Sequence, residues 1–151
     1  MRKCTLLALV LLGGAAGADR PDLNGDWRLD PSHTQGSDSK TKAYALTIHQ
    51  TDESIGLSEA ITDTDGKERK TEIQCKTDGG ECKVKQGTVS FWYDGSSLVL
   101  MEVRRNNANV IKRRFQTSED GKSLSMEITP IAPPGQKVET LTFAKQGAES
   151  H

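Results

Sequence analysis

Four Asp-Gly pairs divide this chain into short segments, and their spacing constrains the fold more than any other feature. The pairs are Asp65-Gly66, Asp78-Gly79, Asp94-Gly95 and Asp120-Gly121. Glycine accepts the positive φ angle that tight hairpin turns require, and aspartate tolerates it better than most residues. Between the pairs, apolar and polar residues alternate, and no window carries a sustained helical stripe. The pattern therefore predicts an all-β, antiparallel meander.

The same signals predict eight to ten short strands, ten if Gly87 separates two of them and nine if it only marks a bulge within one. Sequential antiparallel strands can remove their exposed edges by closing into a barrel or a strongly curled sheet. Residues 31–42 and 131–136, rich in serine, glycine and proline, are expected to be connections. The predicted strands are Asp26–Leu29, Ala43–Gln50, Ser54–Asp63, Glu68–Lys76, Glu81–Gln86, Thr88–Tyr93, Ser97–Arg105, Val110–Thr117, Ser123–Thr129 and Lys137–Lys145.

Turn geometry also predicts which side chains lie opposite one another, because a register shift of one residue moves every side chain to the other face. A two-residue turn at Asp120-Gly121 places Phe115 opposite Met126. At Asp65-Gly66 the apolar residues on both flanks are odd-numbered, so a three-residue loop with the glycine in a bulge is required. These two turns are therefore expected to differ in kind.

The Asp94-Gly95 turn assigns an inner and an outer face to its hairpin. A two-residue turn there places Phe91 opposite Leu98. Residues of the other parity then face away from the interior and either form an exposed apolar patch or lie under a loop such as 31–42. They are Trp92, Val99, Met101 and Val103.

Cysteine usage points to a disulfide. Cys4 lies in the predicted leader, which leaves Cys75 and Cys82, and an even count favours a bridge in an oxidising compartment. A two-residue turn at Asp78-Gly79 places the two cysteines opposite each other across a hairpin. In the loop-entropy treatment, a bridge closing about eight residues contributes about 2.5 kcal/mol. The three histidines are scattered without metal-ligand spacing, so no metal site and no cofactor are predicted.

The first 18 residues have the features of a cleaved signal peptide. Arg2 and Lys3 precede an apolar run over Leu6–Leu12, and small residues with an A-x-A pattern end at Ala18. The run is too short to span a bilayer, so a secreted or periplasmic protein without membrane insertion is expected. A single domain over residues 19–146 and a disordered tail over 147–151 are expected to follow. The formal net charge of −1 gives no global field that attracts nucleic acid.

Several stretches resemble a known group of barrels. Asn24-Gly25-Asp26-Trp27 is similar to the G-x-W element of the calycins, and three later stretches resemble small secreted bacterial lipocalin-like proteins: 92–95, 118–124 and 140–143. The resemblance implies a barrel that binds small apolar ligands, with Trp27 closing one end. An arginine from the last strand often covers that tryptophan in the family, whereas the last strand here carries Lys145.

The sharpest candidate for a ligand contact is Arg113. The Asp120-Gly121 register places it on the apolar face, opposite Ile128. A buried guanidinium requires an anionic partner, which a ligand carboxylate or an internal acid such as Glu59 would supply. A ligand pocket around it is predicted from Tyr44, Phe91, Tyr93, Phe115 and Met126, unless these side chains fill the barrel.

The leading functional hypothesis is a binding module for a small apolar or anionic ligand. The alternative is a module that binds a secreted protein, such as an enzyme that it inhibits. It would use the outer patch around Trp92 or the basic hairpin that contains Arg104, Arg105, Lys112, Arg113 and Arg114. No nucleophile elbow, Cys-His pair or carboxylate pair is recognisable, so an enzyme is not predicted.

Overall fold

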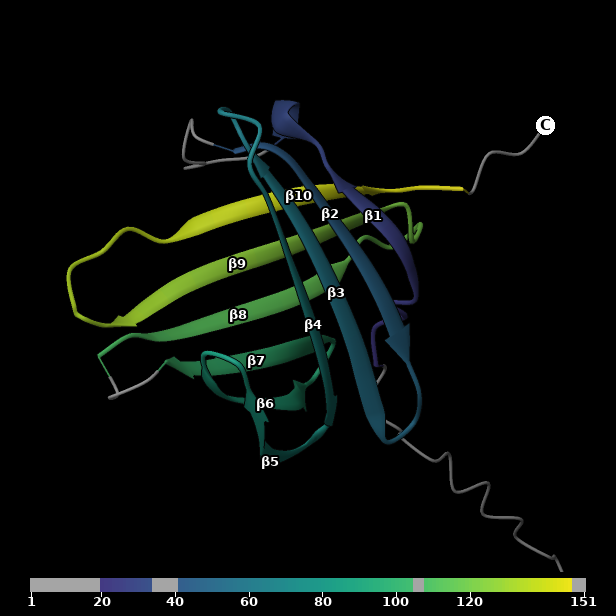
Figure 1. The fold of residues 1–151 in the computed structure, drawn as a ribbon. Coiled ribbons are helices and arrows are strands. Elements are labelled where there is room, and N and C mark those ends of the chain that lie inside the picture. Colours follow the sequence, from purple (N-terminus) through teal and green to yellow (C-terminus); the bar gives the residue numbers. More distant parts are fainter. Residues whose placement is uncertain (1–19, 34–40, 105–107, 148–151) are drawn as a thin grey trace, which may run out of the picture.

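Ten antiparallel strands form one sheet that curls into a nearly closed barrel (Figure 1). The structure is a computed structural model that describes residues 20–33, 41–104 and 108–147. The predicted signal peptide lies outside these residues, as does the predicted tail beyond Gly147. Within the described residues, no helix has the length and apolar character needed to cross a membrane.

The elements follow the predicted order closely. They are β1 (Gly25–Leu29), a 3-10 turn η1 (Pro31–His33), β2 (Thr41–Gln50), β3 (Ser54–Asp63), β4 (Glu68–Lys76), β5 (Asp78–Val84), β6 (Gly87–Asp94), β7 (Ser97–Arg104), β8 (Val110–Thr117), β9 (Ser123–Ala132) and β10 (Glu139–Lys145). The strand order is β4-β3-β2-β1-β10-β9-β8-β7-β6-β5. In Figure 1 the layer of β1 to β4 crosses the layer of β6 to β10, so the inward side chains of both layers share one core.

At two of the four turns the predicted register is confirmed, although the loop at Asp120-Gly121 has four residues between Ser118 and Ser123 instead of two. The Asp65-Gly66 turn is a three-residue loop, closed by a hydrogen bond from Asp63 N to Lys67 O, and Gly66 has a φ of 87°. The β8–β9 register has Phe115 opposite Met126. In both hairpins, the side chains that face inward and outward are therefore those that the alternation predicts.

The register at Asp94-Gly95 is shifted by two residues. Asp94 and Ser97 close the turn, so Gly95 and Ser96 occupy its tip, and Leu98 lies opposite Tyr93 instead of Phe91. A shift of two leaves every side chain on its predicted face. The prediction was wrong in register and right in parity, because the aspartate precedes the turn instead of occupying it.

The hairpin predicted at Asp78-Gly79 does not form. Among the described strands, β4 and β5 are the two ends of the sheet, with no ladder between them. Only Thr77 separates them, and β5 begins at Asp78, which lies opposite Trp92 of β6. The Asp-Gly pair therefore belongs to β5 itself, and β4 and β5 take their hydrogen-bonded partners from β3 and β6.

The disulfide prediction is confirmed. Cys75 of β4 and Cys82 of β5 are bonded, with their Cα atoms 5.9 Å apart. Since no ladder joins these strands in the described structure, the bridge is a covalent connection across the one unpaired seam of the barrel. Its role is therefore to hold two sheet edges together, where a hairpin would have used backbone hydrogen bonds.

Gly87 separates β5 from β6, so the nine-strand alternative is wrong. Lys85 and Gln86 form the turn, and Gly87 begins β6 opposite Arg104 of β7. A Cβ atom on Gly87 would lie 2.0 Å from the carbonyl oxygen of Val103. Glycine is needed here because the two backbones approach too closely for any side chain.

One end of the barrel is sealed by the segment that precedes β1. Leu23 is fully buried, and its carbonyl accepts a hydrogen bond of 2.9 Å from the indole of Trp27. Gln50 clamps the segment: its side chain accepts from Leu23 N and donates to Pro21 O and to the Tyr93 hydroxyl. The ammonium of Lys145 lies 5.6 Å from the Trp27 ring. A lysine of the last strand thus lies near the Trp27 ring.

Candidate functional site

Four charged or polar side chains form a chain of contacts through the other end of the barrel interior. Arg113 of β8 donates from Nη1 to Glu59 Oε1 of β3 at 2.7 Å, and its Nη2 lies 3.5 Å from Glu102 Oε2 of β7. The Tyr44 hydroxyl of β2 donates to Glu59 Oε2. We refer to Tyr44, Glu59, Glu102 and Arg113 as the interior polar cluster. It links strands from both layers, because each residue occupies an inward position of its strand.

The cluster is strongly coupled electrostatically. Burial and the adjacent Glu59 carboxylate raise the pKa of Tyr44 above its usual range, so this hydroxyl keeps its proton as a donor. Burial alone would lower the pKa of Arg113, but the neighbouring carboxylates, Glu59 first, outweigh it and hold that pKa above its usual value. Arg113 is therefore a permanent cation and Tyr44 a neutral donor at any physiological pH.

The cluster becomes less buried toward one rim of the barrel. The side chain of Glu59 is 5% exposed and that of Glu102 is 10% exposed, whereas Arg104, two residues further along β7, is 42% exposed. Arg104 Nε lies 3.4 Å from Glu102 Oε1. Since the N-terminal segment seals the opposite end, we call this rim the open end, a name that refers to the described residues alone, because residues 105–107 after Arg104 lie outside them.

Two half-buried apolar side chains neighbour members of the cluster, one along a strand and one across a ladder. Ile61 follows Glu59 by two residues on β3, and Ile128 lies opposite Arg113 across the β8–β9 ladder. Both pack against the core but keep part of their surface accessible. A polar group flanked by accessible apolar side chains is the composition that a site for a small amphiphile needs.

One donor of the cluster has no partner in the described structure. Arg113 Nε is buried and makes no hydrogen bond to any described residue. A buried donor without an acceptor costs about 1–3 kcal/mol. Water or a ligand oxygen that reaches this atom would therefore be stabilised.

The predicted ligand-contact residues occupy different regions of the molecule. Arg113 and Tyr44 meet through Glu59, as the internal-acid alternative for Arg113 required. Tyr93 lies at the sealed end, where its hydroxyl accepts from Gln50. The remaining three are at most 1% exposed and pack in the core: Phe91, Phe115 and Met126. Their role in ligand binding stays a prediction.

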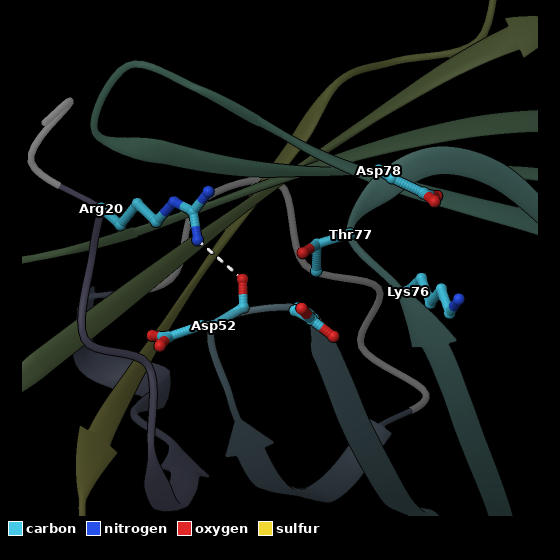
Figure 2. Close-up of a pocket in the computed structure, with 6 residues that line it drawn as sticks. Arg20, Asp52, Lys76, Thr77 and Asp78 are labelled. Carbon is cyan, nitrogen blue, oxygen red and sulfur yellow. Dashed lines mark hydrogen bonds between the residues drawn. The ribbon is translucent and has the colours of Figure 1, made fainter.

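Two surface pockets among the described residues have open mouths, and Glu59 of the interior polar cluster is part of the lining of one of them. The larger, of about 390 Å³, adjoins the sealed end (Figure 2). Arg20 reaches across it to donate to the backbone oxygen of Asp52, and Thr77 and Asp78 line the other side. The second lies over β2 to β4 and has a volume of about 210 Å³. In the part of the chain that is described, three or more His, Cys, Asp or Glu side chains nowhere gather as metal ligands would.

Glu102 is a member of the cluster that sequence analysis missed. Its number has the same parity as the inward Leu98 and Leu100 on β7. Parity therefore placed a carboxylate inside the barrel on the strand next to Arg113. The alternation could have identified it as an interior acid, although only the three-dimensional structure pairs it with the guanidinium.

The outer face of the β6–β7 hairpin is apolar, as its parity predicts. Trp92 is half-buried and lies opposite Val99, which is 1% exposed. Met101 and Val103 continue the row and are half-buried. Most of the loop suggested as a cover for this patch, residues 34–40, lies outside the described residues.

The basic hairpin does not form one cationic surface. Arg113 faces the interior, Arg104 pairs with Glu102, and Arg114 lies 3.3 Å from Asp94 on the outer face. The alternation of a strand sends neighbouring cations to opposite faces. Arg105 lies outside the described residues. The described cations of this hairpin are therefore divided between the interior and the outer face.

Comparison with solved structures places this architecture among calycin-type barrels. A secretory abundant heat-soluble protein of Ramazzottius varieornatus superposes with a TM-score of 0.58 at 14% identity, covering 83% of this chain and 96% of that protein. A point mutant of the fluorescent protein UnaG gives 0.58 at 13% identity, with 82% and 96% covered.

A third structure is a complex with a small molecule. Zebrafish ileal bile acid-binding protein with cholic acid gives a TM-score of 0.55 at 14% identity, covering 81% of this chain and 97% of that protein. None of the three is named as an enzyme. No family model and no curated protein sequence matches the chain. At these identities the likeness establishes the fold, which is the calycin-type barrel that the G-x-W resemblance predicted.

Proposed function

We propose that this protein is an extracytoplasmic barrel that binds a small, partly apolar ligand at its open end. The observation that carries the proposal is the interior polar cluster, which places buried charged groups next to two half-buried isoleucines. The fold supports it, since a barrel of the same fold is solved with cholic acid. The core is closely packed, so an apolar tail would lie against Ile61 and Ile128 and displace side chains near the rim.

Arg113 is the polar centre of this proposed site. Replacing it with lysine keeps the charge but removes the planar fork that reaches two carboxylates at once. We expect Arg113→Lys to weaken ligand binding at least fivefold. The control is Arg114→Lys, an adjacent arginine on the outer face, which should leave binding unchanged. Equal affinities in both variants would remove Arg113 from the site.

The direct test is native mass spectrometry of the protein isolated from its own source. A co-purified small molecule, released when the protein unfolds, is the expected result. Protein of the bare chain mass, which also fails to take up any amphiphile after delipidation, would contradict the proposal. The bound molecule's mass would identify the ligand class directly.

A second candidate function is protein binding through the outer face of β6 and β7. It is favoured by the packed interior and by the half-buried row of Trp92, Met101 and Val103. Trp92→Ser should then abolish capture of a secreted partner and leave small-molecule binding intact. Capture of the partner that persists in Trp92→Ser would remove this face from the proposed binding surface.

The proposal also includes export of the protein and the bounds of its mature domain. Removal of residues 1–18 would leave a single domain over 19–146 and a short tail, in a protein similar to small secreted bacterial lipocalin-like barrels. The disulfide supports an oxidising compartment. N-terminal sequencing of the exported protein should give Asp19 as its first residue. A retained leader would refute this assignment.

A further inference from the structure

The interior polar cluster carries more negative than positive charge around its centre. The two terminal nitrogens of Arg113 face separate carboxylates, Glu59 at 2.7 Å and Glu102 at 3.5 Å. Arg104 also contacts Glu102, but its side chain is 42% exposed, so solvent and salt screen much of its effect. Within the buried part of the cluster, two carboxylates therefore share one guanidinium.

The two carboxylates are not equally satisfied. Glu59 accepts a short hydrogen bond from Arg113 on one oxygen and the Tyr44 hydroxyl on the other. Among the described residues, both contacts of Glu102 are long, at 3.5 Å to Arg113 and 3.4 Å to Arg104. A carboxylate has about four lone-pair sites. Glu102 therefore has capacity to accept further hydrogen bonds, and it lies closer to the open rim.

An incoming carboxylate would fit this arrangement poorly. Arg113 offers it only Nε, because the two other nitrogens already face Glu59 and Glu102. One hydrogen bond would have to offset repulsion from two carboxylates within a poorly solvated site. An ammonium meets the opposite situation, because it donates to Glu102 and brings the buried charge to balance.

We propose that the ligand of the open end is an amphiphile with a cationic, hydrogen-bond-donating head, such as a long-chain amine, held by Glu102. Its tail lies against Ile61 and Ile128 at the rim. The proposal rests on the proposed ligand-binding function and names the head-group chemistry of that site. Arg113 acts by holding both carboxylates in place and makes no direct bond to the head group.

The test compares three ligands of one chain length: decylamine, decan-1-ol and decanoate. At pH 7 the amine is cationic and the acid is anionic, because their pKa values resemble those of lysine and glutamate side chains. Isothermal titration of delipidated protein, below the micellar concentration of each compound, should give at least tenfold tighter binding of decylamine than of decanoate, with decan-1-ol between them. Equal or tighter binding of decanoate overturns the inference and leaves the binding function standing. Binding of none of the three overturns both.

A matched pair of variants locates the effect. Glu102→Gln should weaken decylamine binding at least fivefold and change decan-1-ol binding less than twofold. Glu127→Gln removes the same charge from an exposed position of β9 and should change neither. Unchanged decylamine binding in Glu102→Gln would overturn the assignment to Glu102. The head-group order in the unaltered protein decides the charge preference even if this variant fails to fold.

Discussion

At the scale of single residues, Arg113 shows how the predicted register of one hairpin places a charge inside an apolar core. The Phe115–Met126 pairing predicted from the Asp120-Gly121 turn carries Arg113 inward, opposite Ile128. Sequence alternation thus predicted where the guanidinium lies. It left the partner open, because Glu59 and Glu102 lie on strands that only the closed barrel brings near.

Removing Arg113 should be much more costly than removing its neighbour. Arg113→Met leaves two buried carboxylates without their cation, and losing one partner of a buried pair costs about 3–5 kcal/mol. Arg114→Met removes a pair whose side chains are 31% and 61% exposed and should cost less than about 1 kcal/mol. Urea denaturation at pH 7 measures both free energies of unfolding. Similar losses in the two variants would contradict the buried ion pair.

Tyr44 should make stability depend on pH in alkali. Its pKa is raised in the folded state by burial and by Glu59, while in the unfolded chain a tyrosine ionises near pH 10. Its contribution is therefore complete below about pH 10 and declines above it by up to about 1.4 kcal/mol per pH unit.

The variant Tyr44→Phe isolates that contribution. At pH 7 it should be less stable by about 1.5–3 kcal/mol, because a charged carboxylate loses a hydrogen bond. Denaturation series at pH 7, 9, 10 and 11 should show this difference constant up to about pH 10 and smaller at pH 11. A difference that stays constant or widens at pH 11 would contradict a raised pKa of Tyr44 in the folded protein.

At the scale of elements, the Asp-Gly pairs were a better guide to where the chain turns than to which strands are hydrogen-bonded neighbours. The three-residue loop at Asp65-Gly66 follows from parity, because the apolar residues of β3 and β4 had to share a face. Asp78-Gly79 has the same local chemistry, yet β4 and β5 are not hydrogen-bonded neighbours in the described sheet. A turn signal is local, whereas strand neighbours depend on how the whole sheet closes.

The seam between β4 and β5 should be the part of the barrel most dependent on its covalent bridge. Replacing Cys75 and Cys82 together with serine should lower the free energy of unfolding by about 2.5 kcal/mol, the loop-entropy contribution of a short bridge. Amide exchange should increase first at β4 and β5, since no ladder joins them there, and remain slow in the β8–β9 hairpin. Uniformly faster exchange would show that the bridge stabilises the molecule globally.

At the scale of the whole molecule, the two ends of the barrel differ in a way that periodicity does not reveal. The meander and the neighbouring placement of β1 and β10 follow from the strand pattern. The segment before β1 has no alternation, so its role in sealing one end was not predictable beyond Trp27. The seal depends on long-range hydrogen bonds of a single glutamine, which no local pattern identifies.

Gln50 should therefore contribute more to stability than the other glutamines of the strands. Gln50→Ala removes three hydrogen bonds that tie Leu23, Pro21 and Tyr93 together at 2.7 to 2.9 Å. Part of these groups is buried, so the expected loss is about 2–3 kcal/mol. The Leu23 amide should also lose its protection against hydrogen exchange.

Gln74→Ala is the matched control, because Gln74 is exposed on β4 and its loss should change stability by less than about 0.5 kcal/mol. Because the seal and the interior polar cluster lie at opposite ends, Gln50→Ala should also leave the order of decylamine, decan-1-ol and decanoate affinities unchanged. A changed order would mean that ligands enter or bind through the sealed end, next to Arg20 and Asp52. That result would move the binding site to the opposite end of the barrel while keeping the fold as described.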